Sequence, residues 1–271
     1  MTGMTSRIVI VSDCTDVAYV EMRLAILNAA STLNPEADVR IEPLVAAQPF
    51  SEINAAFLMR LIAESAAPGT TIMCVLNSLP ERTERLVGRT GRGGLVFTGA
   101  NTGALGWLAE DFGVAECFHI DDPGFVPFGG RTIHAPAVGA LAAGRRPADL
   151  GKPFPAGAVR RIPVSEGLIV HVDNFGNAKF AFDADGLLPG DPLRVTLGDR
   201  TIDAVYGRRM MDHEDGTWVV YPGSSFGLHE LGQVRSRGLL DHDCGAGHTV
   251  EIRRRRSRVP SASTGRWPHT V

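Results

Sequence analysis

The sequence predicts an α/β protein of two domains, in which a mostly parallel sheet covered by helices precedes a smaller antiparallel β-barrel domain. Short apolar runs alternate with helical periodicities over roughly the first 150 residues, which is typical of a parallel, helix-covered sheet. Segment 151–164 is rich in Pro and Gly, and the apolar runs after it are short and separated by turn residues. We therefore expect an α/β domain over 1–155, a β-barrel domain over 165–253, and a basic tail without fixed structure over 254–271.

Each element of the first domain follows from a local pattern. Run 7–13 is β-branched and apolar and ends in Ser and Asp, which predicts a buried strand. Residues 18–33 carry apolar side chains at helical spacing, and 51–66 repeats that pattern behind a serine cap. The glycine-rich, basic run 88–94 precedes a strand, so it predicts a hairpin turn rather than a phosphate-binding loop. The remaining predicted elements are strands at 39–45, 71–77 and 94–99, a short helix ending at 107, and a helix at 135–143.

The second domain is predicted from a different pattern. Its apolar runs are short, and turn residues separate them, which favours a small antiparallel barrel or sandwich. The predicted strands lie at 167–173, 193–197, 202–206, 217–221 and 248–252.

Composition limits the partners. Hydrophobic residues make up 44% of the 271 residues, and the net charge of −3 argues against nucleic acid, apart from the arginine run 253–256. No apolar stretch approaches the roughly 18 residues of a membrane span, and the N-terminus lacks the apolar core of a signal peptide. The four cysteines are scattered, so neither a zinc site nor a disulfide framework is indicated. We expect a cytoplasmic protein that contacts no membrane and holds no metal.

Polar residues follow several of the predicted strands. Asp13 ends the first strand, Asn77 ends the strand that begins at 71, and the loop 99–103 follows another. In a parallel, helix-covered sheet, ligands bind beyond the carboxyl ends of the strands. The sequence therefore predicts a ligand site near Asp13, Asn77 and the loop 99–103.

A serine hydrolase is one alternative, because Gly223–Gly227 matches the G-x-S-x-G elbow. Ser225 would be the nucleophile, and it needs a His base and an orienting acid. The candidates downstream are His229, His242 and His248 with Asp241 or Asp243. The motif falls in the all-β domain, however, whereas the elbow of such hydrolases lies inside a parallel sheet. The run 241–248 has no recognised metal-ligand spacing, which argues against a metal site there.

A second segment of interest is Asp173–Asn177, with the sequence DNFGN, directly after a predicted strand. Gly176 allows a close backbone approach, and Asn177 carries the donor and the acceptor that recognition of an adenine edge requires. The same residue types form Asx turns, and the segment taken alone favours that interpretation.

Five segments, in this order along the chain, resemble the S-adenosylmethionine hydroxide adenosyltransferase family, which is related to fluorinating and chlorinating enzymes. Of these five, Asp173–Asn177 matches the family's D-x-F-G-N motif in full, and the other four match their family motifs in part. The segments are Ser12–Thr15 with Tyr19-Val20, Gly99–Gly103, Phe128–Pro136, Asp173–Asn177 and Ser224-Ser225.

The resemblance implies an α/β domain followed by a small β-barrel, and a homotrimer whose site lies between one subunit's large domain and its neighbour's small domain. It implies that S-adenosylmethionine is the substrate, with no cofactor, and that a nucleophile displaces methionine from the ribose C5′ carbon. Asp13 would bind the ribose hydroxyls, Asp173 the methionine amine, Asn177 the adenine and Ser225 the methionine carboxylate. Phe175 and Phe226, beside these residues, would also line the substrate site.

The sequence departs from the family at the catalytic positions. Asn77 replaces an Asp, Gly129 replaces a His, and Arg85 matches the family arginine only if one residue is inserted. Asn cannot take a proton, and Gly offers only backbone, so a water-using enzyme would need a substitute base. The candidates are Glu81, Glu84 and His134.

Three functions stay open under the resemblance. Water gives adenosine and methionine, and this is the function that we expect. A halide needs no base, and Phe128 with the N–H groups of Gly129 and Gly130 would suit an anion. A binding protein would hold an adenosyl compound without chemistry. Lys179 stands where relatives place an aromatic near the adenine.

Overall fold

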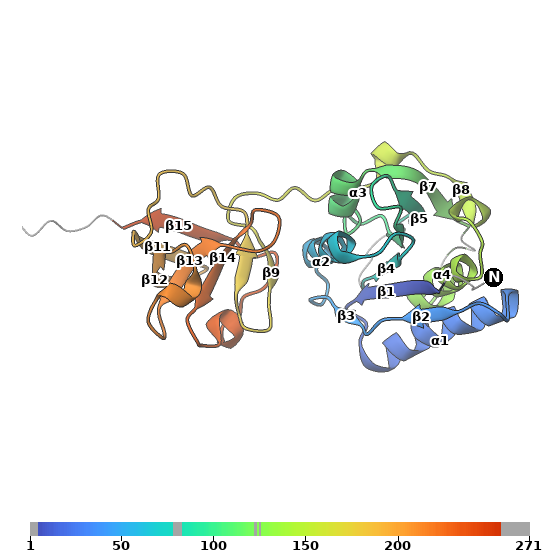
Figure 1. Ribbon diagram of the computed structural model, residues 1–271, viewed down its shortest axis with the longest axis horizontal. Coiled ribbons are helices and arrows are strands. Elements are labelled where there is room, and N and C mark those ends of the chain that lie inside the picture. Colours follow the sequence, from blue (N-terminus) through green and yellow to red (C-terminus); the bar gives the residue numbers. More distant parts are fainter. Residues whose placement is uncertain (1–4, 78–82, 122–123, 125, 256–271) are drawn as a thin grey trace, which may run out of the picture.

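The computed structural model describes residues 5–77, 83–121, 124 and 126–255. It contains two sheets joined by a long connection, which confirms the predicted α/β class with two sheets (Figure 1). The first sheet spans residues 6–153 and the second 169–254. Within the described part of the chain, no helix combines the length and apolar character that crossing a membrane requires.

The first sheet has eight strands in the order β2-β1-β4-β6-β5-β7-β8, with β3 also paired to β1. Strands β1, β2, β3, β4 and β6 are mutually parallel, whereas β5, β7 and β8 join by antiparallel pairs. The bounds are β1 (Ser6–Ser12), β2 (Val39–Ile41), β3 (Val45–Ala46), β4 (Thr71–Val75), β5 (Arg85–Thr90), β6 (Val96–Ala100), β7 (Val114–Ile120) and β8 (Gly151–Pro153).

The antiparallel half of this sheet departs from the sequence prediction. Strand β5 has two arginines and a glycine, β7 has Glu116 and His119 among its apolar residues, and β8 is Gly-Lys-Pro, so these strands lack the continuous apolar run of a buried parallel strand. The predicted hairpin turn is present, since β5 and β6 pair antiparallel around residues 91–95. The single strand predicted at 39–45 is two short ones, because Pro43 lies between them and has no N–H to donate.

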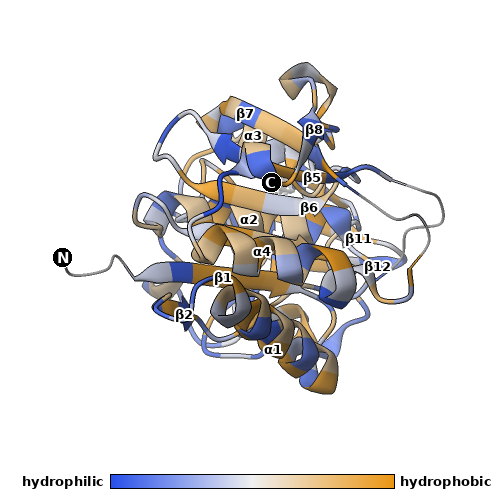
Figure 2. Cartoon of the chain, turned by 90° about the vertical axis from the view of Figure 1, so that its right-hand side faces the viewer, coloured by the Kyte–Doolittle hydropathy of each residue, from blue (hydrophilic) through white to orange (hydrophobic). Residues whose placement is uncertain are grey.

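Helices cover both faces of the first sheet. They are α1 (Asp16–Leu33), α2 (Glu52–Ser65), α3 (Gly106–Phe112) and α4 (Ala135–Ala142). Side chains alternate between the two faces of a strand, so β1 sends Ile8 and Ile10 into the core under α1 and α4, and Val11 into the core under α2. Figure 2 views this domain, with the largely hydrophobic β1 behind α1 and α4.

The second sheet has seven strands in the order β15-β11-β12-β13-β14-β10-β9 and curls around its own apolar core. Its two edges approach each other, because a bridge joins Leu168, next to β9, to Thr249, next to β15. All pairs are antiparallel except β12 with β13. The bounds are β9 (Ile169–Val172), β10 (Ala178–Phe180), β11 (Pro192–Leu197), β12 (Arg200–Tyr206), β13 (Trp218–Pro222), β14 (His229–Gln233) and β15 (Val250–Arg254).

The end of the chain is partly sheet rather than tail. Arg254 ends β15 and pairs with Asp191 at 2.7 Å, and the Arg255 guanidinium lies 2.8 Å from Asp203. The sequence prediction places these two arginines in the basic tail, because it cannot show the carboxylates that they meet. The rest of the predicted tail lies outside the described residues.

The two sheets meet at α2. Val170 of β9 and Leu228, just before β14, belong to the same apolar cluster as Phe57 of α2. The Phe57 ring stacks on the imidazole of His171, with ring centroids 5.0 Å apart. Helix α2 is therefore buried on two sides, which explains why nine of its fourteen residues are buried.

A row of polar side chains crosses the face of the second sheet that lies opposite its apolar core. His171, Lys179, Glu230 and Tyr221 stand directly opposite one another on β9, β10, β14 and β13. Lys179 and Glu230 form a buried ion pair, and the Tyr221 hydroxyl donates to the other carboxylate oxygen of Glu230 at 2.7 Å. Desolvation by burial is the main cause of the raised pKa of Tyr221, and the hydrogen bond to Glu230 adds to it.

We predict that Lys179→Met strongly destabilises the protein, because it leaves the Glu230 carboxylate buried without its cation. The expected loss in the free energy of unfolding is about 3–5 kcal/mol, measured by urea denaturation. The double variant Lys179→Met/Glu230→Gln removes the stranded charge and should recover most of this loss. A single variant as stable as the parent would show that the pair is dispensable.

Candidate functional site

The carboxylate of Asp13 is fixed by two backbone donors at the carboxyl ends of the parallel strands. The N–H of Phe50 donates to one oxygen at 2.9 Å, and the N–H of Asn77 donates to the other at 2.8 Å. Behind it, the buried Ser12 hydroxyl donates to the Val75 carbonyl at 2.6 Å and accepts from the Cys14 N–H. Asp13 and Asn77 therefore meet at this edge, where both are predicted to lie. One N–H on each oxygen leaves further lone pairs for a ligand.

Phe50 is a site residue that the sequence did not reveal. It follows β3, adopts φ +61°, and keeps its side chain 60% exposed. A positive φ is rare for a bulky residue, and such strain gathers at functional sites. The Pro-Phe-Ser sequence before α2 carries no signal for this role, which depends on the meeting of loop 47–50 with the end of β1.

The segment before α4 closes the same edge of the sheet. Gly130–His134 forms a π-helical turn, an irregularity often found at functional sites. Phe128 precedes it with φ +51° and packs among residues from α1 and β4. A Cβ at Gly130 would lie 2.6 Å from Val75 Cγ1, so only glycine fits there. Gly130, Val75 and Phe128 thus form one contact group below Asn77.

Arg85 reaches this group from β5. A Cβ on Gly129 would lie 3.0 Å from Arg85 Nη2, so the guanidinium lies directly over that glycine. The structure therefore brings a cation to the backbone of Gly129.

The structure shows the surroundings of two of the three substitute bases predicted from the sequence. His134 is buried and bonds Thr98 through Nδ1 at 2.9 Å; burial, reinforced by the charge of Arg85, lowers its pKa to about 3. That value makes it a weak base. Glu84 accepts from the Asn101 side chain at 3.2 Å, and hydrogen bonds from its own backbone N–H and from Asn101 lower its pKa. Glu81 lies outside the described residues.

The loop 99–103 has a structural role. Asn101 is buried; its side chain accepts from the Arg160 N–H at 2.8 Å and donates to the Ala158 carbonyl at 3.2 Å. A Cβ at Gly103 would lie 2.4 Å from Ile162. This loop therefore holds the connection between the two sheets in place, and none of these contacts is with the residues around Asp13.

The segment Asp173–Asn177 is an Asx-type turn, as its residue types indicate. One Asp173 oxygen accepts from the N–H groups of Phe175 and Asn177, both at 2.9 Å, and the other accepts from the Asn177 side chain. Gly176 has φ +81° and approaches the Arg237 carbonyl too closely for any side chain. Phe175 stands at the tip, 65% exposed. The turn therefore exposes the Phe175 ring, whereas the Asn177 side chain is buried against it.

The loop carrying Ser225 and Phe226 packs against the first domain. Phe226 lies between Phe57 and Trp107, with the Arg60 guanidinium 3.8 Å from its ring centroid. Ser225 is buried in the β13–β14 hairpin. Among the described residues, no hydrogen bond joins Ser225 to a histidine, the contact by which a base activates a serine nucleophile.

The downstream histidines of that alternative have other contacts. His242 contacts Arg200, and His248 Nδ1 accepts from the Gly245 N–H. In the part of the chain that the structure describes, no three His, Cys, Asp or Glu side chains are grouped so that they could hold a metal ion.

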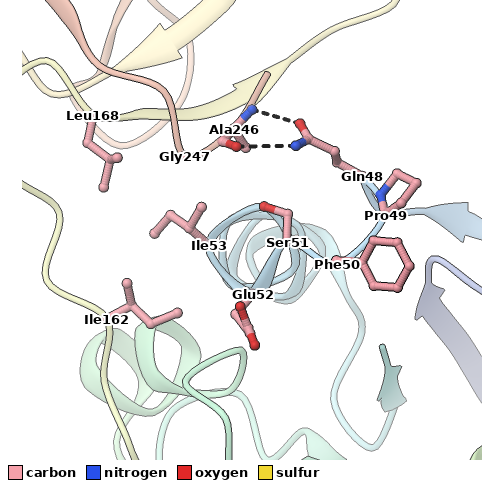
Figure 3. Close-up of a pocket in the computed structure, with 10 residues that line it drawn as sticks. All are labelled: Gln48, Pro49, Phe50, Ser51, Glu52, Ile53, Ile162, Leu168, Ala246 and Gly247. Atoms are coloured by element: carbon pink, nitrogen blue, oxygen red, sulfur yellow. Dashed lines mark hydrogen bonds between the residues drawn. The ribbon is translucent and has the colours of Figure 1, made fainter. Parts of the chain in front are cut away.

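A crevice of about 380 Å³ lies where the two domains meet, beside the loop that supplies Phe50 (Figure 3). Gln48 spans it by donating to the Ala246 carbonyl at 3.2 Å and accepting from the Ala246 N–H at 2.7 Å. Its lining comes from the start of α2, the connection and the 246–247 loop: Gln48, Pro49, Phe50, Ser51, Glu52, Ile53, Ile162, Leu168, Ala246 and Gly247.

The predicted site residues thus fall into separate groups. Asp13, Asn77, Arg85, Phe128, Gly129 and Gly130 gather at the strand ends of the first sheet. Asp173, Phe175 and Asn177 share one turn of the second domain, whereas Ser225 and Phe226 lie at the junction with α2.

Comparison with known proteins identifies the fold and no function. No protein-family model and no curated protein matches the chain. An uncharacterized conserved protein from Thermotoga maritima has a similar crystal structure, with a TM-score of 0.74 and 21% identity over 90% of this chain and 99% of that one. A conserved hypothetical protein from Thermus thermophilus has a TM-score of 0.70 and 22% identity, over 92% and 100% of the two chains. The whole two-domain arrangement therefore occurs in other proteins.

The two glycines before α4 should respond differently to alanine. Gly130→Ala places a Cβ against Val75 and Met22 in the core, and we expect a loss of about 1–3 kcal/mol from overpacking. Gly129→Ala meets only the movable end of Arg85 and should change stability by less than about 0.5 kcal/mol. Thermal unfolding of both variants tests the packing, and equal losses would contradict it.

Proposed function

We propose that the protein binds S-adenosylmethionine and releases methionine by nucleophilic displacement at the ribose C5′ carbon, with water as nucleophile. The observation that carries the proposal is the gathering of Asp13, Asn77, Arg85 and Gly129 at one edge of the sheet. These are the positions to which the family resemblance assigns ribose binding and catalysis. The curled second sheet also fits the small β-barrel domain that the resemblance implies.

The chemistry is balanced without a cofactor. A lone pair of water forms the new bond to C5′ as the C5′–sulfur bond breaks, and the electron pair of that bond neutralises the sulfonium. The products are adenosine, methionine and one proton. Because the leaving group is already good, alignment of the attacking atom, carbon and sulfur supplies most of the acceleration.

Asp13 would hold the ribose. Its oxygens are oriented by the N–H groups of Phe50 and Asn77, so the carboxylate is preorganised to accept from two vicinal hydroxyls. Arg85 would stabilise hydroxide, or a water losing its proton, beside the Gly129 backbone. His134 is too weak a base for this step, and the Glu84 carboxylate accepts a hydrogen bond from Asn101 and has a lowered pKa.

A halide is the second candidate nucleophile, and Arg85 over Gly129 is the observation that favours it. A halide needs a positive charge and N–H donors but no base. Phe128 and Val75 would supply the apolar side of such a pocket.

Incubation of purified protein with S-adenosylmethionine, followed by chromatography with mass detection, separates these functions. Adenosine and methionine without added halide support the water reaction. A 5′-halogenated nucleoside that forms only with chloride, bromide or fluoride supports the halide reaction. Ligand-induced thermal stabilisation without turnover indicates a binding protein. With neither binding nor turnover, the proposal fails.

Asp13→Ala should weaken binding of S-adenosylmethionine at least tenfold, since it removes the proposed ribose acceptor and leaves two N–H donors unpaired. Isothermal titration calorimetry measures the effect. Asp38→Ala is the matched control, because that aspartate lies at the opposite end of β1, near Ser6. Equal affinities for the two variants would refute the placement of the ribose.

Arg85→Gln should lower kcat by about 100-fold, the usual scale for losing a charged group that stabilises the transition state, and should change KM much less. Steady-state kinetics with the preferred nucleophile measures both constants. An effect confined to KM would show that Arg85 binds substrate rather than assisting the attack.

A further inference from the structure

Asn54, in the first turn of α2, uses every hydrogen-bonding group of its side chain. Its Oδ1 accepts from the Gln48 N–H at 2.8 Å, while its Nδ2 donates to the Val170 carbonyl at 3.1 Å and contacts His171 Nδ1 at 2.9 Å. The residue is buried. It therefore links the loop 47–50 of the first domain directly to β9 of the second.

The loop 47–50 is the one that orients Asp13. Its Ala47 N–H donates to the Ser12 carbonyl at 2.9 Å, and its Phe50 N–H donates to the Asp13 carboxylate. Gln48 also joins it to Ala246 of the second domain (Figure 3). The positive φ of Phe50 persists only because the surrounding contacts hold it, and Asn54 supplies the contact at the centre of the loop.

We propose that Asn54 is a positioning residue for Asp13, and that through His171 it makes the setting of the Asp13 loop depend on how the second domain packs against α2. The consequence for ligand binding rests on the proposed function, whereas the coupling itself belongs to the fold. No contact between Asn54 and substrate is required.

The contacts of Asn54 also determine the protonation state of the His171 imidazole. A flipped amide would set Nδ2 against the Gln48 N–H and Oδ1 against the Val170 carbonyl, so Nδ2 must face His171. His171 Nδ1 is then an acceptor and the imidazole is neutral. Protonation of Nδ1 would place two donors face to face and break this contact.

The groups facing His171 set the direction of its titration. The pKa of His171 is lowered, mainly by burial and then by the charge of Lys179 on β10. The carboxylates of Asp173, just after β9, and Glu230 on β14 oppose these effects. From α2, Asn54 and the Phe57 ring face it, and neither titrates. Undocked protein therefore binds the proton at a higher pH than docked protein. Docking is therefore favoured at neutral pH, where the imidazole is uncharged in both states, and it weakens as the pH falls and the undocked protein binds the proton.

Hydrogen–deuterium exchange of the full-length protein, without ligand, tests the coupling. Protection factors for residues 47–51 are compared at pH 7.5 and 5.5, because they are corrected for the intrinsic pH dependence of exchange. Asn54→Ala should lower protection of this segment at least tenfold at pH 7.5. Asn34→Ala is the matched control, since Asn34 lies at the end of α1 and bonds only its local turn. Protection in Asn54→Ala within twofold of the control would overturn the proposal.

Two further variants test the role of His171 even if Asn54→Ala fails to fold. His171→Asn keeps an acceptor near the Nδ1 position and cannot titrate there, so its protection should be the same at both pH values. In Asn54→Asp a carboxylate faces His171 and favours its protonated form. Protection should then be higher at pH 5.5 than at pH 7.5, which is the reverse of the pH dependence expected for the parent protein. His171 is not the linking group if His171→Asn still loses protection at pH 5.5, or if Asn54→Asp shows the same pH dependence of protection as the parent protein.

Titration calorimetry with S-adenosylmethionine then connects the coupling to Asp13. Weaker binding by Asn54→Ala than by Asn34→Ala, in step with the lost protection, supports positioning of Asp13. Unchanged affinity in a variant with lost protection would refute that part. If the parent protein does not bind the compound, the proposed function fails, while the exchange result still decides the coupling.

Discussion

The candidate site of the first domain depends on the placement of one carboxylate at the end of β1. Asp13 needs an N–H on each oxygen, and these donors come from the loops after β3 and β4. Both strands pair with β1 in parallel, so the register of three strands decides whether the donors arrive. The buried Ser12 hydroxyl joins the ends of β1 and β4 on the inner side. The same strand ends therefore carry the local fold and the candidate site.

The second domain contributes to this edge through α2. The helix is packed between the first sheet and β9, with Phe57 in the shared apolar cluster and Asn54 bonded to both sides. Its first turn and the preceding loop line the crevice of Figure 3. A change in domain packing therefore reaches Phe50 and Asp13 over very few bonds, without any need to deform the first sheet.

The sequence was informative wherever periodicity alone decides structure. Apolar runs located β1, β4 and β6, and polar residues after them located Asp13 and Asn77. It failed at β5, where two arginines and a glycine interrupt the apolar run, and at β7, where Glu116 and His119 do so. Phe50 and Asn54 could not be found, because their roles depend on contacts between distant segments. The Asx turn at 173–177 was predicted from residue types, since its hydrogen bonds are local.

Electrostatics explains why the proposed reaction would draw on both domains. S-adenosylmethionine carries a sulfonium, so the positive charge of Arg85 suits the side of C5′ from which the nucleophile attacks and would oppose binding on the sulfur side. The amine of the methionine part needs a carboxylate on that far side. In the proposed reaction Asp173 would meet this need from the second domain, because its oxygens, although they accept from the turn, keep lone pairs for a cation. In-line displacement requires the attacking atom and the sulfur on opposite sides of C5′. A cation from β5 and a carboxylate from another domain would suit that geometry in the proposed reaction, whereas one compact cluster would bring the two charges together and neutralise both.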